Sequence, residues 1–371
     1  MKKILLGTTG LVGAALLATA ASAETPKVTL GGFSDFQAGF TSDDQDANTR
    51  STGFRNDNEI TVKVDGKTDG GLAYGAEIDL EADTTNDANS QGTNASRTFT
   101  YLSGGWGRAE MGDNKSVAAT MRVDASTLAS ATGGINGAWT YFVNGTNTAE
   151  FVTTSKLVAE HGSVTGFGDE STYNATKVSY YTPKYMGFQG GVSYTPDIAS
   201  RGQSLTRADN TAGGIENIWD LGLSYENQFS GGIKLAAAVT GEFGGAETTA
   251  TEDTRAWNLG ALLGYKGFSV AGSYGDWSDS DTTSGLDSTY WTAGLGYEAG
   301  PVGLSATYLD STRDASATTE NDFTNLVLGA DYKLAPGLTP YAEVSFYDFD
   351  SAGTTYDNQG TTVILGTQVA F

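Results

Sequence analysis

The feature that most constrains this chain is an alternation of apolar with small or polar residues that recurs along most of its length. After residue 23, segments of about ten alternating residues are joined in turn by tight turns and by long polar loops. Successive side chains of a β-strand point to opposite faces, so each segment predicts a strand with one apolar and one polar face. We count about sixteen segments, an even number that returns both chain ends to the same side of a barrel.

The stretch from residue 217 to 243 shows the alternation clearly. Its apolar face carries Trp219, Leu221, Leu223, Tyr225, Ile233, Leu235, Ala237 and Val239. Its other face carries Asp220, Gly222, Ser224, Glu226, Lys234, Ala236, Ala238, Thr240 and Glu242. A two-residue turn at Lys266–Gly267 joins the next pair of segments. There the alternation predicts that Leu263 and Val270 point outward and that Gly260 points inward.

This pattern suits either a soluble sandwich, whose apolar faces pack on a core, or a membrane barrel, whose apolar faces meet lipid. Two features favour the barrel. The polar faces are rich in Gly, Ser, Thr and charge, which predicts a wet lumen. Aromatic residues also stand at the ends of the apolar faces, where interfacial girdles require them: Trp219, Tyr225, Tyr265, Tyr297 and Tyr332. The predicted fold class is therefore all-β, a transmembrane antiparallel β-barrel of about 16 strands.

The chain ends in TTVILGTQVAF, a further alternating segment that stops at Phe371. A terminal strand with free hydrogen-bonding groups would fray or aggregate unless it were paired. Pairing with the first segment, KVTLGGFSDFQAGF, would close the barrel and remove the free edge. Phe371 is therefore predicted to complete barrel closure.

The first 23 residues have two lysines, an apolar stretch and an Ala-Ser-Ala ending, which predicts a secretory signal peptide over 1–23. The remainder, 24–371, forms one predicted barrel domain. An exported chain with no cysteine must be stable without disulfides. A formal net charge of −23 excludes the basic footprint of a nucleic-acid partner.

Residues 97–116 read RTFTYLSGGWGRAEMGDNKS, a strand, a tight glycine turn and a strand ending in Met-Gly-Asp. Together with the segment GKTDGGLAYGAE and the terminal Phe371, this sequence resembles the trimeric general porins of Gram-negative outer membranes, in particular the alphaproteobacterial group. The resemblance covers the whole mature chain. It implies a homotrimer in the outer membrane, contact with lipid and lipopolysaccharide, and recognition of Phe371 by the outer-membrane insertion machinery.

The resemblance also implies that the third external loop folds into the barrel and narrows it. The longest irregular stretch, about 113–171, lies at the matching place. Within it, SVAATMRVDASTLA predicts a short helix, and GAWTYFV is apolar enough to cover the loop against the wall or against a neighbouring subunit.

Across from this loop, porins of this kind place basic residues on the inner wall. Here the inward face of one strand mixes both signs, which weakens any separation of charge. The candidate constriction residues are Arg55, Asp57, Glu59, Lys63, Arg108, Glu110, Asp113, Asp124 and Glu150. For Arg55 and Lys63, local pairing with Asp57 and Glu59 is an equally good interpretation.

Acidic residues crowd the long loops, whereas lysines and arginines lie near the short turns. An acidic outer rim suits either divalent cations that bridge to lipopolysaccharide or a simple solvated surface. Asp279, Asp281 and Asp287 are the candidate ligands for structural Ca²⁺ or Mg²⁺. No other cofactor is expected.

Catalytic motifs are scarce, because His161 is the only histidine and no cysteine is present. We therefore expect no enzyme but a porin: a water-filled channel for passive diffusion of small hydrophilic solutes and ions, with a weak preference for cations. The alternatives are a barrel enzyme acting at the membrane surface and a structural barrel that anchors the envelope.

Overall fold

A computed structural model describes residues 24–44, 50–82, 94–143, 175–198, 200, 202, 210, 214–249, 252–278, 280, 286–352 and 357–371. The predicted signal peptide, 1–23, lies outside these residues. Among the described residues, no helix is long and apolar enough to cross a membrane.

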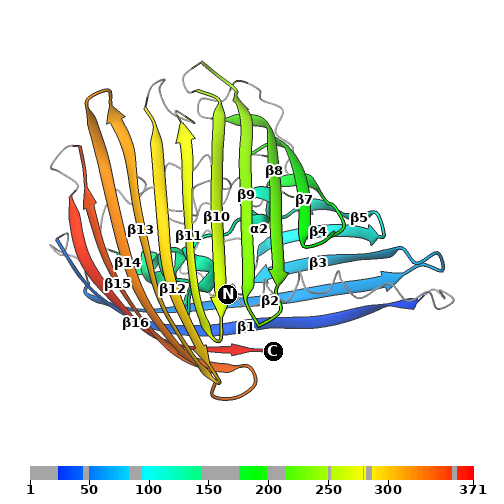
Figure 1. Ribbon diagram of the computed structural model, residues 1–371, viewed down its shortest axis with the longest axis horizontal. Coiled ribbons are helices and arrows are strands. Elements are labelled where there is room, and N and C mark those ends of the chain that lie inside the picture. Colours follow the sequence, from blue (N-terminus) through cyan, green and yellow to red (C-terminus); the bar gives the residue numbers. More distant parts are fainter. Residues whose placement is uncertain are drawn as a thin grey trace.

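The described chain forms one closed antiparallel barrel, in which each strand pairs with its neighbours in sequence (Figure 1). The first eight strands are β1 (Glu24–Asp43), β2 (Thr52–Lys67), β3 (Ala73–Glu81), β4 (Asn94–Gly104), β5 (Gly107–Asp113), β6 (Thr176–Tyr181), β7 (Phe188–Asp197) and β8 (Ile215–Gln228). The next eight are β9 (Lys234–Ala246), β10 (Thr254–Tyr265), β11 (Phe268–Ser278), β12 (Ser288–Ala299), β13 (Val302–Ser316), β14 (Thr319–Tyr332), β15 (Leu338–Asp350) and β16 (Asn358–Ala370). The predicted barrel and its strand number are confirmed.

Pairing of the first and last strands closes the barrel. β1 runs antiparallel to β16 with Phe33 opposite Ala370 and Asp43 opposite Gly360. Phe371 continues the pairing beyond β16, because it exchanges two backbone hydrogen bonds of 3.1 Å with Gly32. Neither strand is left with a free edge along this pairing, as the terminal alternation predicted.

Short turns join the strands at one end of the barrel, and the connections at the other end are longer, except for the two-residue turn between β13 and β14. The turn between β10 and β11 consists of Lys266 and Gly267, whose φ angles are 47° and 87°. Two consecutive positive φ angles characterise the type I′ turn, whose twist matches that of the flanking strands. Glycine adopts its angle without strain, which explains a Lys-Gly pair between two apolar segments.

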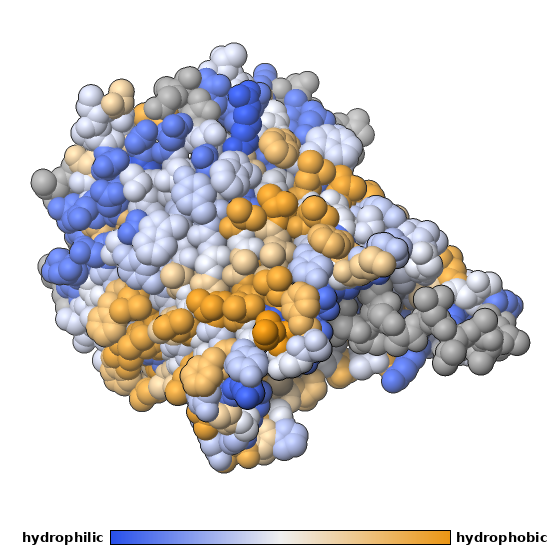
Figure 2. Space-filling view, viewed as in Figure 1, coloured by the Kyte–Doolittle hydropathy of each residue, from blue (hydrophilic) through white to orange (hydrophobic). Residues whose placement is uncertain are grey.

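The outer face of the barrel is apolar, as the alternation predicted. Leu263 and Val270 face each other across β10 and β11 and are 48% and 47% exposed. Cross-strand aromatic pairs occur near both ends of the strands, among them Phe268–Tyr297 near a short turn and Trp291–Tyr308 toward the loops. Figure 2 shows apolar residues gathered across the middle and lower parts of this face and hydrophilic ones toward the loops. Such a band with aromatic borders fits a bilayer.

The third loop contains all the described helices. They are the α-helix α2 (Val117–Met121) and the 3₁₀ helices η2 (Ala125–Leu128), η3 (Gly134–Asn136) and η4 (Ala138–Phe142). The short helix predicted in this loop is therefore present. Ser116 caps α2 by accepting a hydrogen bond from the Ala119 backbone N–H, which is the usual reason a helix begins after serine.

Candidate pore and constriction

The described part of the third loop lies inside the barrel and follows its inner wall. α2 packs against β7, β8 and β9, and η2 packs against β11 and β12. η3 then contacts β13 and β14, and η4 reaches β15, β16 and β1. The loop is thus folded inward, as the resemblance implied, and the inner faces of β2 to β5 face it across the lumen.

Inward-facing glycines on the wall leave room for the loop backbone. A Cβ atom added at Gly260 would lie 1.8 Å from the carbonyl oxygen of Val123, and one added at Gly329 would lie 2.8 Å from that of Ser130. Gly191, Gly222 and Gly294 likewise lie directly beneath loop side chains or backbone. These five glycines therefore form a flat surface on the inner wall, here called the glycine bed, against which the loop packs.

Polar side chains of the wall fix the loop by accepting hydrogen bonds from its backbone. The acceptors and donors are Ser193 with Val117 (3.0 Å), Thr292 with Ala125 (3.1 Å), Ser305 with Ser130 (2.8 Å), Glu343 with Thr132 (3.1 Å) and Thr307 with Ile135 (3.1 Å). Backbone N–H groups in the first turn of a short helix or between helices have no partner within the helix and must be satisfied elsewhere. Here the wall satisfies them and holds the loop at intervals along its path.

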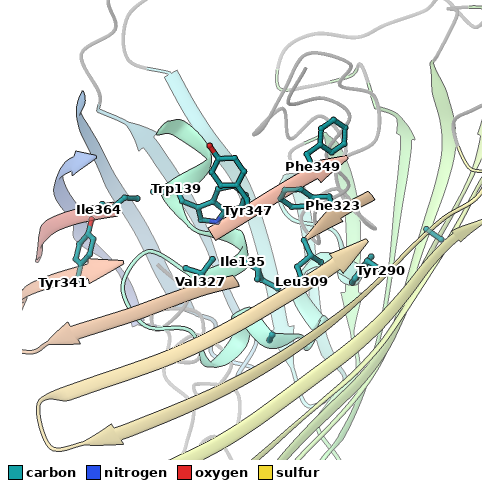
Figure 3. Close-up of a cluster of buried hydrophobic side chains, with 14 residues drawn as sticks. Ile135, Trp139, Tyr290, Leu309, Phe323, Val327, Tyr341, Tyr347, Phe349 and Ile364 are labelled. Atoms are coloured by element: carbon teal, nitrogen blue, oxygen red, sulfur yellow. The ribbon is translucent and has the colours of Figure 1, made fainter. Parts of the chain in front are cut away.

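An apolar cluster fills the space between the end of the loop and β12 to β16. Trp139 is fully buried, and its ring stacks on those of Phe323 and Tyr347 with centroids 6.2 and 5.8 Å away (Figure 3). Ile135 and Leu309 complete the contact from the loop and from β13. The inward face is therefore dry beneath the loop, whereas the alternation alone predicted a wet lumen throughout. The segment GAWTYFV covers the loop against the wall, one of the two possibilities that its composition left open.

Opposite the loop, the inner face of β2 to β5 carries a row of ion pairs. The pairs are Arg55–Asp57 (2.9 Å), Lys63–Glu77 (3.7 Å), Arg97–Glu77 (3.3 Å), Arg97–Asp79 and Arg108–Glu110 (2.5 Å). In each pair the basic side chain is the more exposed, at 21–30% against 0–13% for the carboxylates. Long basic side chains therefore reach into the lumen above carboxylates that lie closer to the wall.

Two arginines of this wall also stack on tyrosine rings. The Arg55 guanidinium lies 3.9 Å from the ring centroid of Tyr141, which belongs to η4 of the loop. The Arg108 guanidinium lies 3.8 Å from the centroid of Tyr101 on β4. The first contact joins the wall to the loop, so it marks one edge of the opening between them.

The structure sorts the predicted constriction residues into four groups, of which Asp124 is the last. Arg55, Asp57, Glu59, Lys63, Arg108 and Glu110 all lie on the inner wall of β2 and β5. Asp113 falls on the opposite face of β5 from Glu110, where its carboxylate accepts a hydrogen bond from Thr176. Glu150 lies outside the described residues. The role of the inner-wall residues at a constriction stays a prediction.

Asp124 is held within the loop instead of facing the lumen. It is 1% exposed, caps η2 through the backbone N–H of Ser126 at 2.8 Å, and lies 3.0 Å from Arg122. A capping and pairing role accounts for its burial.

The predicted cation ligands Asp279 and Asp281 lie outside the described residues. Asp287 is described, and its backbone N–H donates to the Asp314 carboxylate. Among the residues that the structure describes, no cluster of three or more acidic or histidine side chains could hold a metal ion.

Sequence reasoning missed Arg97, Glu77, Asp79 and Tyr141. Arg97 follows from the alternation of β4, since it shares a face with Phe99 and Tyr101. The register shift at Asp79–Leu80, however, breaks the simple count from the preceding strand. The position of Tyr141 depends on the path of the loop, which no periodicity reveals.

A family model described as Gram-negative porin matches residues 7–352. Uncharacterized proteins of Rickettsia bellii and Rickettsia felis are 27% and 28% identical over the full length of both chains. Among solved structures, an anion-selective porin from Comamonas acidovorans aligns with a TM-score of 0.64 at 17% identity, covering 94% of this chain and 100% of that one. The trimer form of in-vitro folded OmpT from Vibrio cholerae aligns with a TM-score of 0.60 at 12% identity and the same coverage.

Proposed function

The chain belongs to the Gram-negative porin family, and we propose that it forms a water-filled channel through which small hydrophilic solutes and ions diffuse passively across the outer membrane. The observation that carries the proposal is the asymmetry of the lumen. The described loop covers β6 to β16 and β1, whereas β2 to β5 present charged side chains to the space that remains. Charged groups on an inner wall require water or ions beside them.

We further propose a weak preference for cations. Acids outnumber bases on the inner wall of β1 to β5: Asp35, Asp43, Asp57, Glu59, Asp65, Glu77, Asp79, Glu81 and Glu110 against Lys27, Arg55, Lys63, Lys67, Arg97 and Arg108. Charges in a pore lined by protein concentrate the counter-ion. The Debye length is about 8 Å at physiological ionic strength, so the preference should weaken as salt rises.

The outer face of β1 and β2 supports the homotrimer. Ser34, Asn56 and Asn58 point outward there, and the Ser34 hydroxyl donates to the Asn58 side chain at 2.6 Å. Beside them, Phe36 and Phe54 form an exposed pair, and Phe54 is 80% exposed. Amide side chains are costly in lipid but suit a protein interface that also buries aromatics. We propose that other copies of this chain cover this face.

Recording from planar bilayers tests the channel directly. The mature protein, folded in detergent and added at low concentration, should produce discrete conductance steps. In a salt gradient, the zero-current potential should have the sign of cation preference and should shrink at higher salt. Correctly folded protein that inserts without conductance would contradict the channel, and a potential of the opposite sign would contradict only the ion preference.

A further inference from the structure

We propose that the wall of β2 to β5 is a binding surface for small zwitterionic solutes, in which Arg97 attracts the solute carboxylate and Glu59 attracts the solute ammonium group. This inference rests on the proposed channel function, and it names the class of solute that this channel favours. α-Amino acids are the simplest members of the class. Two observations support it: the basic side chains of this wall are more exposed than the acidic ones, and Glu59 forms no ion pair within the described part of the chain.

The side chains of this wall that are most exposed to the lumen are basic, although the wall carries more acidic than basic residues. Arg97 is 23% exposed, whereas the Asp79 carboxylate that it contacts is fully buried. A solute that approaches from the lumen therefore meets the guanidinium before the carboxylates beneath it. A guanidinium presents several N–H donors in a plane, so it can bind the carboxylate of a solute while it keeps a contact with its own partner.

Glu59 supplies the opposite charge on the same wall. Within the described part of the chain, it forms no ion pair, and its one side-chain hydrogen bond is a long one of 3.4 Å from Thr61. It lies on β2 four residues from Arg55 and four from Lys63, about 13 Å along the strand from each. The Glu59 carboxylate thus lies between two basic residues of the same strand, Arg55 and Lys63. Its oxygens can still accept hydrogen bonds from the ammonium group of a solute.

Charge balance favours a zwitterion over simple ions at this surface. A small anion is attracted by Arg97 but repelled by the more numerous carboxylates of the wall. A small cation is attracted by those carboxylates, but it first meets the more exposed basic side chains, which repel it. A solute with one charge of each sign and no net charge gains from both contacts and is opposed by neither. Exposed ion pairs are individually weak, so such contacts speed passage without trapping the solute.

Osmotic swelling of liposomes that contain the mature protein tests this inference with two isomers. Glycine is a zwitterion, and glycolamide has the same formula but no charge. After subtraction of the rates for protein-free liposomes, we expect glycine to enter about two- to five-fold faster than glycolamide, as suits weak exposed contacts. Glu59→Gln and Arg97→Gln should each reduce this ratio toward one, and the ratio within each variant corrects for any change in the general permeability of the channel.

Lys234→Gln provides the control, because Lys234 is an exposed inward-facing base on β9, away from this wall. It should preserve the ratio. Glu59→Gln breaks no ion pair within the described chain, so it keeps the test valid if Arg97→Gln impairs folding. A ratio of one in the unmodified channel, or a ratio preserved in Glu59→Gln, would overturn the inference. Failure of both isomers to enter would instead refute the proposed channel.

Discussion

Gly260→Ala should displace the third loop from the wall. Gly260 lies on the inner face of β10, and an added Cβ would lie 1.8 Å from the Val123 carbonyl oxygen. Cβ atoms essentially never come within 3.0 Å of another heavy atom, so the loop would have to move by more than about 1 Å toward the open lumen. Such overpacking costs about 1–3 kcal/mol. We expect a lower single-channel conductance and a lower thermal unfolding temperature.

Gly264→Ala is the matched control. Gly264 faces inward on the same strand, but its added Cβ would meet its nearest neighbour at 3.6 Å, an ordinary contact. Both substitutions remove the same backbone freedom from the unfolded chain, so this effect cancels in the comparison. Conductance should fall in Gly260→Ala and stay unchanged in Gly264→Ala. Equal conductance and equal stability in the two variants would refute the idea that the loop rests on the glycine bed.

Three further predictions concern the lipid face, the chain end and the loop. Leu263→Arg should impair folding into lipid vesicles much more than Ser224→Arg, because a charge on the lipid face costs about 2–4 kcal/mol at mid-membrane, whereas a charge that points inward does not. Equal folding yields of the two variants would contradict the strand register. Deletion of Phe371 should lower the amount of folded barrel in the outer membrane without lowering export. The amount of folded barrel is measured on gels by its change of mobility on heating, and a normal amount would exclude Phe371 as an assembly signal. Asp124→Asn should leave the zero-current potential unchanged, because Asp124 is buried within the loop and pairs with Arg122 there; a shift of the potential toward anions would show that this charge reaches the passage.

The barrel could be predicted from the sequence because alternation fixes which way each side chain points. Leu263 and Val270 face outward and Gly260 faces inward, as the two-residue period required. The two-residue period shows only which face of the sheet each side chain occupies. It carries no information on which other part of the chain covers the inward face. Gly260 and Glu343 therefore read as ordinary lumen residues, although both lie beneath the loop.

The site was predictable only in part for the same physical reason. Arg55 and Lys63 could be placed on the wall by counting along one strand. The burial of Asp124 and the stacking of Tyr141 on Arg55 depend on how an irregular loop turns. Such turns follow from capping and packing contacts between distant residues, which leave no periodic trace in the sequence.

The central claim is that solutes pass along the inner face of β2 to β5, and adjacent residues on the two faces of β2 test it most directly. Thr61 points inward and Val62 points outward, and the chain has no cysteine of its own. Thr61→Cys and Val62→Cys channels would be recorded in planar bilayers before and after a bulky charged thiol reagent, with labelling confirmed by mass spectrometry. We predict a stepwise fall in conductance for Thr61→Cys alone. Unchanged conductance in fully labelled Thr61→Cys channels, or an equal fall in labelled Val62→Cys channels, would contradict a passage along this wall.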